Sequence, residues 1–191
     1  PLPAYPARPL LQPQTAYAST AFEEKPIVPP VKVETSKVDG KWRLLVDGQE
    51  LYVKGAACNN FYAEAADFGA NVVRTYGVSD KSKAILDAAQ EKGLYVNFGL
   101  YIKRETDGFD YNNAAAVKAQ FDEMKATVER FKDHPALLVW SIGNEAEASY
   151  TNLKLWDAIN DIAKMIHETD PNHPTTTTLA SSNVNHIKNI I

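Results

Sequence analysis

The chain has 191 residues, of which 45% are hydrophobic and 23% are charged, a composition typical of a globular domain with a hydrophobic core. The net charge of -4 argues against nucleic acid as a partner, because phosphate binding needs a basic surface. No apolar run approaches the roughly 20 residues of a membrane-spanning helix, so we expect no membrane partner.

Residues 1–30 differ in composition from the rest of the chain, because eight of the 11 prolines lie there. Proline removes backbone donors and disfavours helix in the residue before it, so we predict an extended linker or a strap lying on the domain. The chain begins with Pro1 rather than Met. We therefore expect a processed or excised piece of a longer protein, and loss of an export signal would favour a secreted or periplasmic location.

Residues 31–191 are predicted to form the structured domain. The Asp47-Gly48 pair lies between the β-rich runs 41–46 and 51–54. Asp-Gly favours the tight turns with positive φ that join antiparallel strands, so this segment is predicted to be a β-hairpin.

Strands and helices alternate after the hairpin. Apolar residues spaced 4, 3, 4 and 3 apart over 117–131 predict one helix. Further helices are predicted over 79–92, with Ser79 as a possible N-cap, around 156–166, and from 184 onward. The predicted strands are centred near Val53, Val73, Val96, Val139 and Thr177.

Repeated strand–helix units indicate an α/β fold with parallel strands and helices packed outside them. No glycine-rich phosphate loop follows any strand, which argues against a dinucleotide-binding open sheet. We predict the (β/α)8 TIM-barrel type. A closed barrel takes about 250 residues, so only the first five strand–helix units are expected here.

An apolar run over 136–142 leads directly into Gly143, Asn144 and Glu145. Barrel enzymes carry their active sites at the carboxyl ends of the strands, and glycosidic cleavage needs an acid there to protonate the departing oxygen. Glu145 suits that role, Asn144 can bind a sugar hydroxyl, and Arg74 can orient a carboxylate at the same rim. The plainer readings are a helix-start carboxylate for Glu145 and an ordinary ion pair for Arg74.

Further polar and aromatic residues follow the predicted strands and can bind a sugar substrate. They are Asn59, Asn60, Tyr76, Tyr101 and Trp140, although Trp140 can instead pack in the barrel. His134 precedes its strand and is predicted to lie at the opposite, stabilising face.

The loop after the third strand is acidic, with Glu105, Asp107 and Asp110. Its simplest reading is a solvated loop, and the alternatives are a lid, a weak cation site or a second catalytic carboxylate. We expect no metal and no cofactor, because acid–base cleavage of a glycoside requires neither.

Four sequence motifs together resemble glycoside hydrolases of clan A, and most closely the barrel domain of family 2. The resemblance covers roughly residues 38–191. Its motifs are Gly-Ala-Asn-Val-Val-Arg-Thr (69–75), Asp-His-Pro-Ala-Leu (133–137), Trp-Ser-Ile-Gly-Asn-Glu (140–145) and Asp-Pro-Asn-His-Pro (170–174).

The resemblance implies a retaining, two-carboxylate glycosidase acting on β-glycosides or on oligo- or polysaccharides. Glu145 would match the general acid/base, Asn144 the residue that holds the sugar 2-hydroxyl, and Arg74 the arginine beside the nucleophile. The nucleophile of the family is a Glu ending strand seven, and no position of this chain matches it. We therefore expect the parent protein to be active and the 191-residue chain to be nearly inactive.

Two other functions remain open at this stage. The β-glucanosyltransferases of fungal walls also join an arginine on strand two to Gly-Asn-Glu after strand four, so transglycosylation is one alternative. The other is a non-catalytic sugar-binding module. An open half barrel of this kind would self-associate or pair with the missing half, because its strand edges are exposed.

Overall fold

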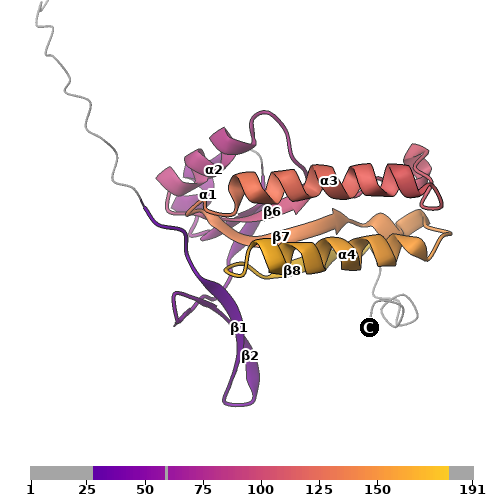
Figure 1. Ribbon diagram of the computed structural model, residues 1–191. Helices are drawn as coiled ribbons and strands as arrows, with labels where there is room; N and C mark the ends of the chain where they lie inside the picture. The colour runs from indigo at the N-terminus through magenta and orange to yellow at the C-terminus, as the bar shows by residue number, and fades with distance from the viewer. Residues whose placement is uncertain (1–27, 59, 181–191) are drawn as a thin grey trace, which may run out of the picture.

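The computed structural model describes residues 28–58 and 60–180, which form two sheets and four α-helices (Figure 1). The strands are β1 (Val33–Val38), β2 (Lys41–Val46), β3 (Gln49–Glu50), β4 (Gly55–Ala57), β5 (Val72–Arg74), β6 (Tyr95–Leu100), β7 (Leu137–Asn144) and β8 (Thr175–Thr178). The helices are α1 (Tyr62–Asp67), α2 (Ser82–Glu91), α3 (Ala114–Phe131) and α4 (Lys154–Thr169), with 3-10 turns at Glu105–Asp107 and Ala146–Ser149.

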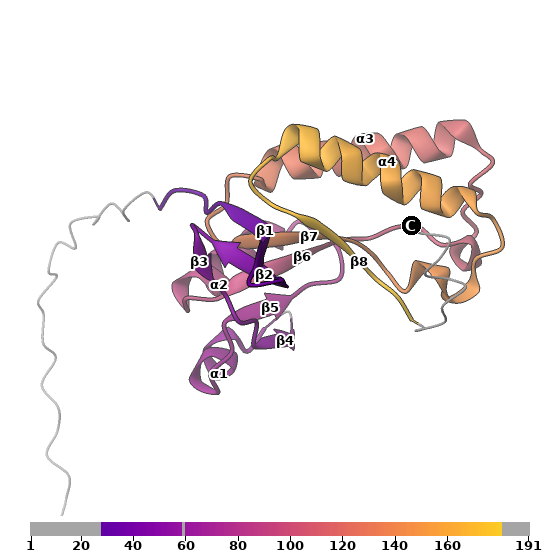
Figure 2. The same ribbon diagram turned by 90° about the horizontal axis from the view of Figure 1, so that it is seen from below.

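The larger sheet has the strand order β4-β5-β6-β7-β8, and every neighbouring pair is parallel. A helix follows each of the first four strands, as sequential strand–helix units of a barrel require. In the view from below, α3 and α4 lie side by side along one face of the sheet (Figure 2). The predicted fold class is therefore confirmed: five parallel strands with outer helices, preceded by a hairpin.

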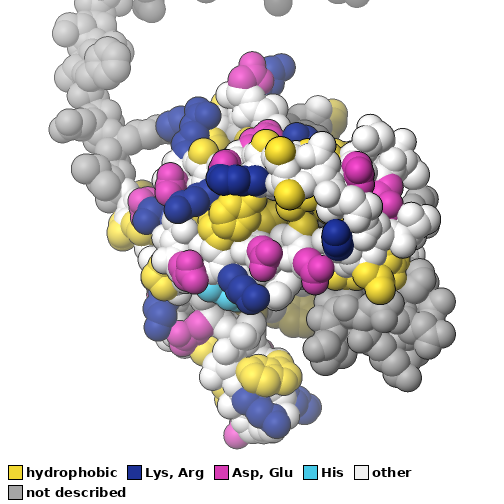
Figure 3. All heavy atoms as spheres, turned by 45° about the vertical axis from the view of Figure 1, so that its right-hand side comes forward, with side chains coloured by type: hydrophobic (Ala, Val, Ile, Leu, Met, Phe, Trp, Pro, Cys, Tyr) yellow, Lys and Arg dark blue, Asp and Glu magenta, His cyan; other side chains and the backbone are white. Residues whose placement is uncertain are grey.

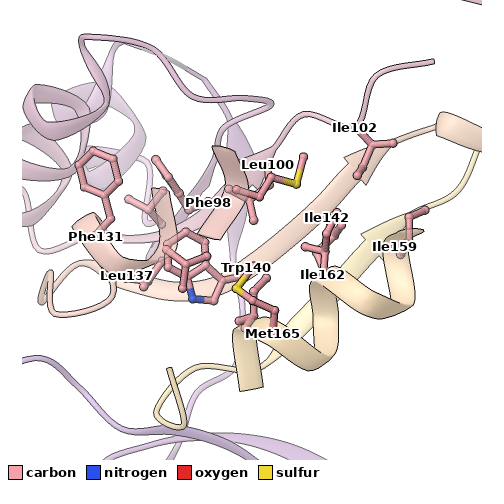
Figure 4. Close-up of a cluster of buried hydrophobic side chains, with 14 of the residues drawn as sticks. Phe98, Leu100, Ile102, Phe131, Leu137, Trp140, Ile142, Ile159, Ile162 and Met165 are labelled. Atoms are coloured by element: carbon pink, nitrogen blue, oxygen red, sulfur yellow. The ribbon is translucent and has the colours of Figure 1, made fainter. Parts of the chain in front are cut away.

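The main hydrophobic core lies between the sheet and the helices α2, α3 and α4 (Figure 4). Phe98 is at its centre, with ring centroids 5.5 Å from Phe131 and 5.6 Å from Trp140. The helix predicted over 117–131 buries Met124, Val128 and Phe131 on this side, as its spacing indicated. Nearer the surface, α3 and α4 border an apolar groove (Figure 3), lined by Val117, Phe121, Ile162 and Met165 and flanked by Lys118, Asp161, Lys164 and Glu168.

A second, smaller core forms on the opposite face of the sheet. The antiparallel strands β1, β2 and β3 pack there, with Val33 and Val46 against Val72 and Leu138. The amide of Val33 donates to the carbonyl of Asn172 at 2.7 Å, which ties the hairpin to the amino end of β8. The hairpin thus covers the interior face of the sheet near the amino ends of its strands.

The structure corrects three predictions of local structure. The Asp47-Gly48 turn forms, but its second strand is only Gln49–Glu50, because residues 51–54 run on toward the barrel; the amide of Lys54 donates to the side chain of Asn71. The first barrel strand is consequently β4 rather than a strand centred at Val53. The third correction concerns Ser79, which precedes the helix that begins at Ser82 and accepts a hydrogen bond from the amide of Lys81.

Strand β1 and its tight turn at Asp39-Gly40 were not predicted from the sequence. Most of the proline-rich segment and the helix predicted from 184 onward lie outside the described residues.

Candidate active site

A β-bulge in β7 places Asn144 at the carboxyl edge of the sheet. Ser141 pairs with Thr176, and Asn144 pairs with Thr178, so three residues of β7 span two residues of β8. Gly143 provides the extra residue at φ 79°. Because side chains alternate between faces, the bulge moves Asn144 from the helix side, where Trp140 and Ile142 pack, to the interior face.

Arg74 and Asn144 meet on this interior face although they are 70 residues apart. The Arg74 Nη2 donates to Asn144 Oδ1 at 2.7 Å, and the guanidinium lies 4.9 Å from the ring centre of Tyr76. The Arg74 Nε is buried without a partner among the described residues. This bond fixes the orientation of the Asn144 amide, because a guanidinium can bond only to its oxygen, and the NH2 group is left to donate to a ligand.

Glu145 is exposed at the same edge and adopts a left-handed backbone conformation with φ 54° and ψ 34°. Its amide donates to the carbonyl of Thr178 at 2.8 Å, and its own carbonyl accepts from Ala148 at 3.1 Å. A non-glycine residue with positive φ costs about 1–3 kcal/mol, and such strain is concentrated at functional sites. The backbone bonds on both sides hold Glu145 in this conformation beside Asn144.

The structure places the predicted substrate-binding residues differently from one another. Tyr76 and Tyr101 are 45% and 43% exposed at the carboxyl ends of β5 and β6, and the Arg74 guanidinium lies over the Tyr76 ring. The Tyr101 hydroxyl donates to Asp107, which anchors that ring. Asn60 is exposed after β4, and Asn59 lies outside the described residues.

Trp140 does not face a ligand, and its prediction as a substrate-binding residue is corrected here. Its side chain is fully buried among the helices, and its indole N–H donates to Asp170 Oδ2 at 2.7 Å. The reason is strand parity, because Trp140 precedes the bulge and points to the helix side of the sheet.

The acidic loop is ordered by its own carboxylates. Glu105 accepts hydrogen bonds from the amides of Thr151 and Asn152, and these bonds lower the pKa of Glu105. Asp107 binds Tyr101 and Arg104, and Asp110 accepts from the amide of Asn112 at 2.8 Å. All three carboxylates have local partners, which does not favour a second catalytic carboxylate from this loop.

The opposite end of the sheet carries a buried polar cluster that sequence reasoning missed. Asp170 accepts from the indole of Trp140 and lies 2.8 Å from His173 Nδ1, with Asp170 and His173 both about 2% exposed or less. His134 also lies at this end, where the sequence predicted it, with its Nε2 3.1 Å from Asp87 Oδ1. Only the short spacing of Asp170 and His173 hinted at this cluster in the sequence.

Within the described part of the chain, no group of three or more His, Cys, Asp or Glu side chains is arranged to hold a metal ion. None of the helices in those same residues is long and apolar enough to cross a membrane.

The fold and the edge residues together define a class: a (β/α) barrel-type domain with an Arg–Asn pair and an adjacent glutamate at the carboxyl ends of its strands. Residues 65–191 match the family model described as "Glycosyl hydrolases family 2, TIM barrel domain". The chain belongs to glycosyl hydrolase family 2, in agreement with the resemblance seen in the sequence.

Individual relatives are glycosidases and are much longer than this chain. A β-galactosidase from Arthrobacter sp. (strain B7) is 31% identical over 110 residues, which are 52% of this chain and 10% of that protein. Among solved structures, Bifidobacterium dentium β-glucuronidase, complexed with coumarin-3-O-glucuronide, matches with a TM-score of 0.63 and 17% identity, covering 83% of this chain and 27% of that one. Dictyoglomus thermophilum β-D-glucuronidase matches with a TM-score of 0.60 and 20% identity, covering 81% and 29%. The structural matches support the fold.

Proposed function

We propose that the protein containing this chain is a retaining glycoside hydrolase and that this chain contributes its acid/base half-site. The observation that carries the proposal is the bond from Arg74 to Asn144 beside Glu145, at the edge where barrel enzymes bind substrate. Family membership supports the reaction class, and the names of the relatives support a β-galactoside or a β-glucuronide as the substrate.

Each of the three residues has a distinct part in the proposed mechanism. Protonated Glu145 donates its proton to the glycosidic oxygen as the bond to the anomeric carbon breaks. The Asn144 NH2 group donates to a sugar hydroxyl, in a contact that strengthens as charge develops on the ring. Arg74 keeps the Asn144 amide in the orientation that makes this contact possible.

A retaining reaction also needs a carboxylate nucleophile about 5 Å from the acid. The carboxylates of the acidic loop are bonded to Thr151, Arg104 and Asn112. We therefore propose that the nucleophile comes from a strand beyond β8 in the longer protein. Arg74, on the interior face beside Asn144, would orient this carboxylate through its guanidinium.

The test is hydrolysis of a panel of aryl β-glycosides by the 191-residue chain and by the longer protein that contains it. We expect turnover only by the longer protein, with a loss of at least 10³-fold on Glu145→Gln. Glu123→Gln, at an exposed position on α3, is the matched control and should leave turnover unchanged.

Two results would contradict the proposal. Activity of the 191-residue chain by itself would require a second carboxylate from within the chain or from a partner copy. Full activity of the Glu145→Gln variant would remove the assigned acid. Formation of glycosylated products in the presence of an acceptor sugar would identify transfer rather than hydrolysis.

A further inference from the structure

The β1–β2 hairpin extends well beyond the sheet that it packs on. In Figure 1 it projects from the sheet on the side opposite α3. Its path begins under the amino ends of β6 and β7, where Val31 lies with Leu94 and Ala136. It then passes the start of β8, where the amide of Val33 bonds to Asn172. The rest of the hairpin projects away from the sheet (Figure 1).

One face of the hairpin changes from buried to exposed along this path. Val33 of β1 pairs with Val46 of β2, and four residues further along β1 Lys37 pairs with Trp42. Because side chains alternate between faces, these four residues share one face of the hairpin. Val33 and Val46 are 4% and 8% exposed against the sheet, whereas Trp42 is 73% exposed. The largest apolar side chain of the hairpin thus continues a packed face but is mostly exposed.

We propose that this face, centred on Trp42, is the docking surface for the opposite wall of the barrel. The occupant is the amino ends of the strands that follow β8 in the longer protein, and this inference rests on the proposed function in requiring that protein. The hairpin would then cross the barrel interior. Val33 and Val46, at one end of the shared face, contact the wall that contains β5 and β7, and Trp42, at the other end of that face, would contact the opposite wall.

Two observations favour this occupant. The first is continuity, since Val33 and Val46 already pack on Val72 and Leu138, and apolar rows of this kind fill the interior of such barrels. The second is length, because the chain covers only 27% and 29% of two structural relatives, which leaves ample polypeptide to form a second wall.

Acrylamide quenching of tryptophan fluorescence tests the proposal without any need for turnover. Trp140 is fully buried and Trp156 is 8% exposed, so the emission lost on Trp42→Phe reports Trp42 alone. In the 191-residue chain this component should be strongly quenched. In the longer protein we expect its quenching constant to fall at least threefold and its emission to shift to shorter wavelength.

The matched control moves the reporter to the other face of the same hairpin. Val38 lies on that face and is 41% exposed, so Val38→Trp in the Trp42→Phe background should remain quenchable in both proteins. Trp42 that stays equally quenchable in the longer protein would overturn the proposal. Shielding of Trp42 in the 191-residue chain that increases with concentration would also overturn it, because a second copy would then be the occupant. An active enzyme with an exposed Trp42 refutes only this inference, and an inactive one with a shielded Trp42 refutes only the proposed function.

Discussion

Replacing Asp170 with alanine is expected to lower the free energy of unfolding by about 3–5 kcal/mol, because buried groups lose the carboxylate that they contact. The carboxylate accepts from Trp140 Nε1 at 2.7 Å and from the amide of Asn172 at 3.1 Å, and it lies 2.8 Å from His173 Nδ1. Its removal leaves the indole and imidazole buried without their acceptor, at about 1–3 kcal/mol each. Since domains are stable by only about 5–15 kcal/mol, the loss should be large.

The Asp170→Asn variant should show a smaller loss that depends on pH. Burial raises the pKa of Asp170, but hydrogen bonds from His173 and Trp140 lower it, and the net pKa lies below its usual value. The unfolded pKa is about 3.9, so the ionised form contributes stability above that pH and loses it as the pH falls through the folded pKa. The difference in stability between wild type and Asp170→Asn should therefore shrink below about pH 4.

Urea unfolding followed by circular dichroism measures both effects. The control is Asp122→Ala, which removes an exposed pair with Lys118 on α3 and should cost at most about 0.5 kcal/mol. The reasoning fails if Asp170→Ala unfolds at the same urea concentration as Asp122→Ala, or if the Asp170→Asn difference grows as the pH falls.

Three further changes test the site and its supports. Gly143→Ala should lower the free energy of unfolding by about 1–3 kcal/mol, because φ is 79° and the new Cβ meets the Ile102 side chain at 3.3 Å. Gly40→Ala, also at positive φ but in open space, should lower it by less. Glu145→Gly should raise the unfolding free energy by about 1 kcal/mol by relieving its left-handed conformation, and an unchanged or lower value would contradict the assigned strain. Glu105→Ala should lower the protection factor for hydrogen exchange at the amide of Thr151, as should acidification below the lowered pKa of Glu105; an unchanged protection factor would show that this bond does not order the loop.

The repeating units of the fold were predictable because local patterns encode them. The apolar stripe over 117–131 marked α3, and the apolar run before Gly143 marked β7. The same run placed Asn144 and Glu145 at the carboxyl edge, since a strand must end where its apolar residues give way to polar ones. Strand β1 escaped prediction because most of its side chains are polar or exposed, and only its pairing with β2 makes it a strand.

The orientation of individual side chains was not predictable, because it depends on register. In β7 two residues, Leu138 and Val139, stand opposite Asn97 alone, and a second irregularity follows Ser141. Each extra residue moves the side chains that follow it to the opposite face of the sheet. Nothing in the residue pattern predicted the irregularity at Leu138 and Val139. The contact of Trp140 with Asp170, which is 30 residues away, was missed for this reason.

The bulge at Gly143 also separates two sets of constraints within a single strand. At Trp140 and Ile142, a substitution in β7 must fit the main hydrophobic core on the helix side of the sheet. After the glycine, Asn144 and Glu145 are held by contacts at the sheet edge and make no demand on that packing. The two residues that follow Gly143 can therefore be exchanged while the glycine is kept, so new ligand-facing groups can be tried there without redesigning the scaffold beneath them.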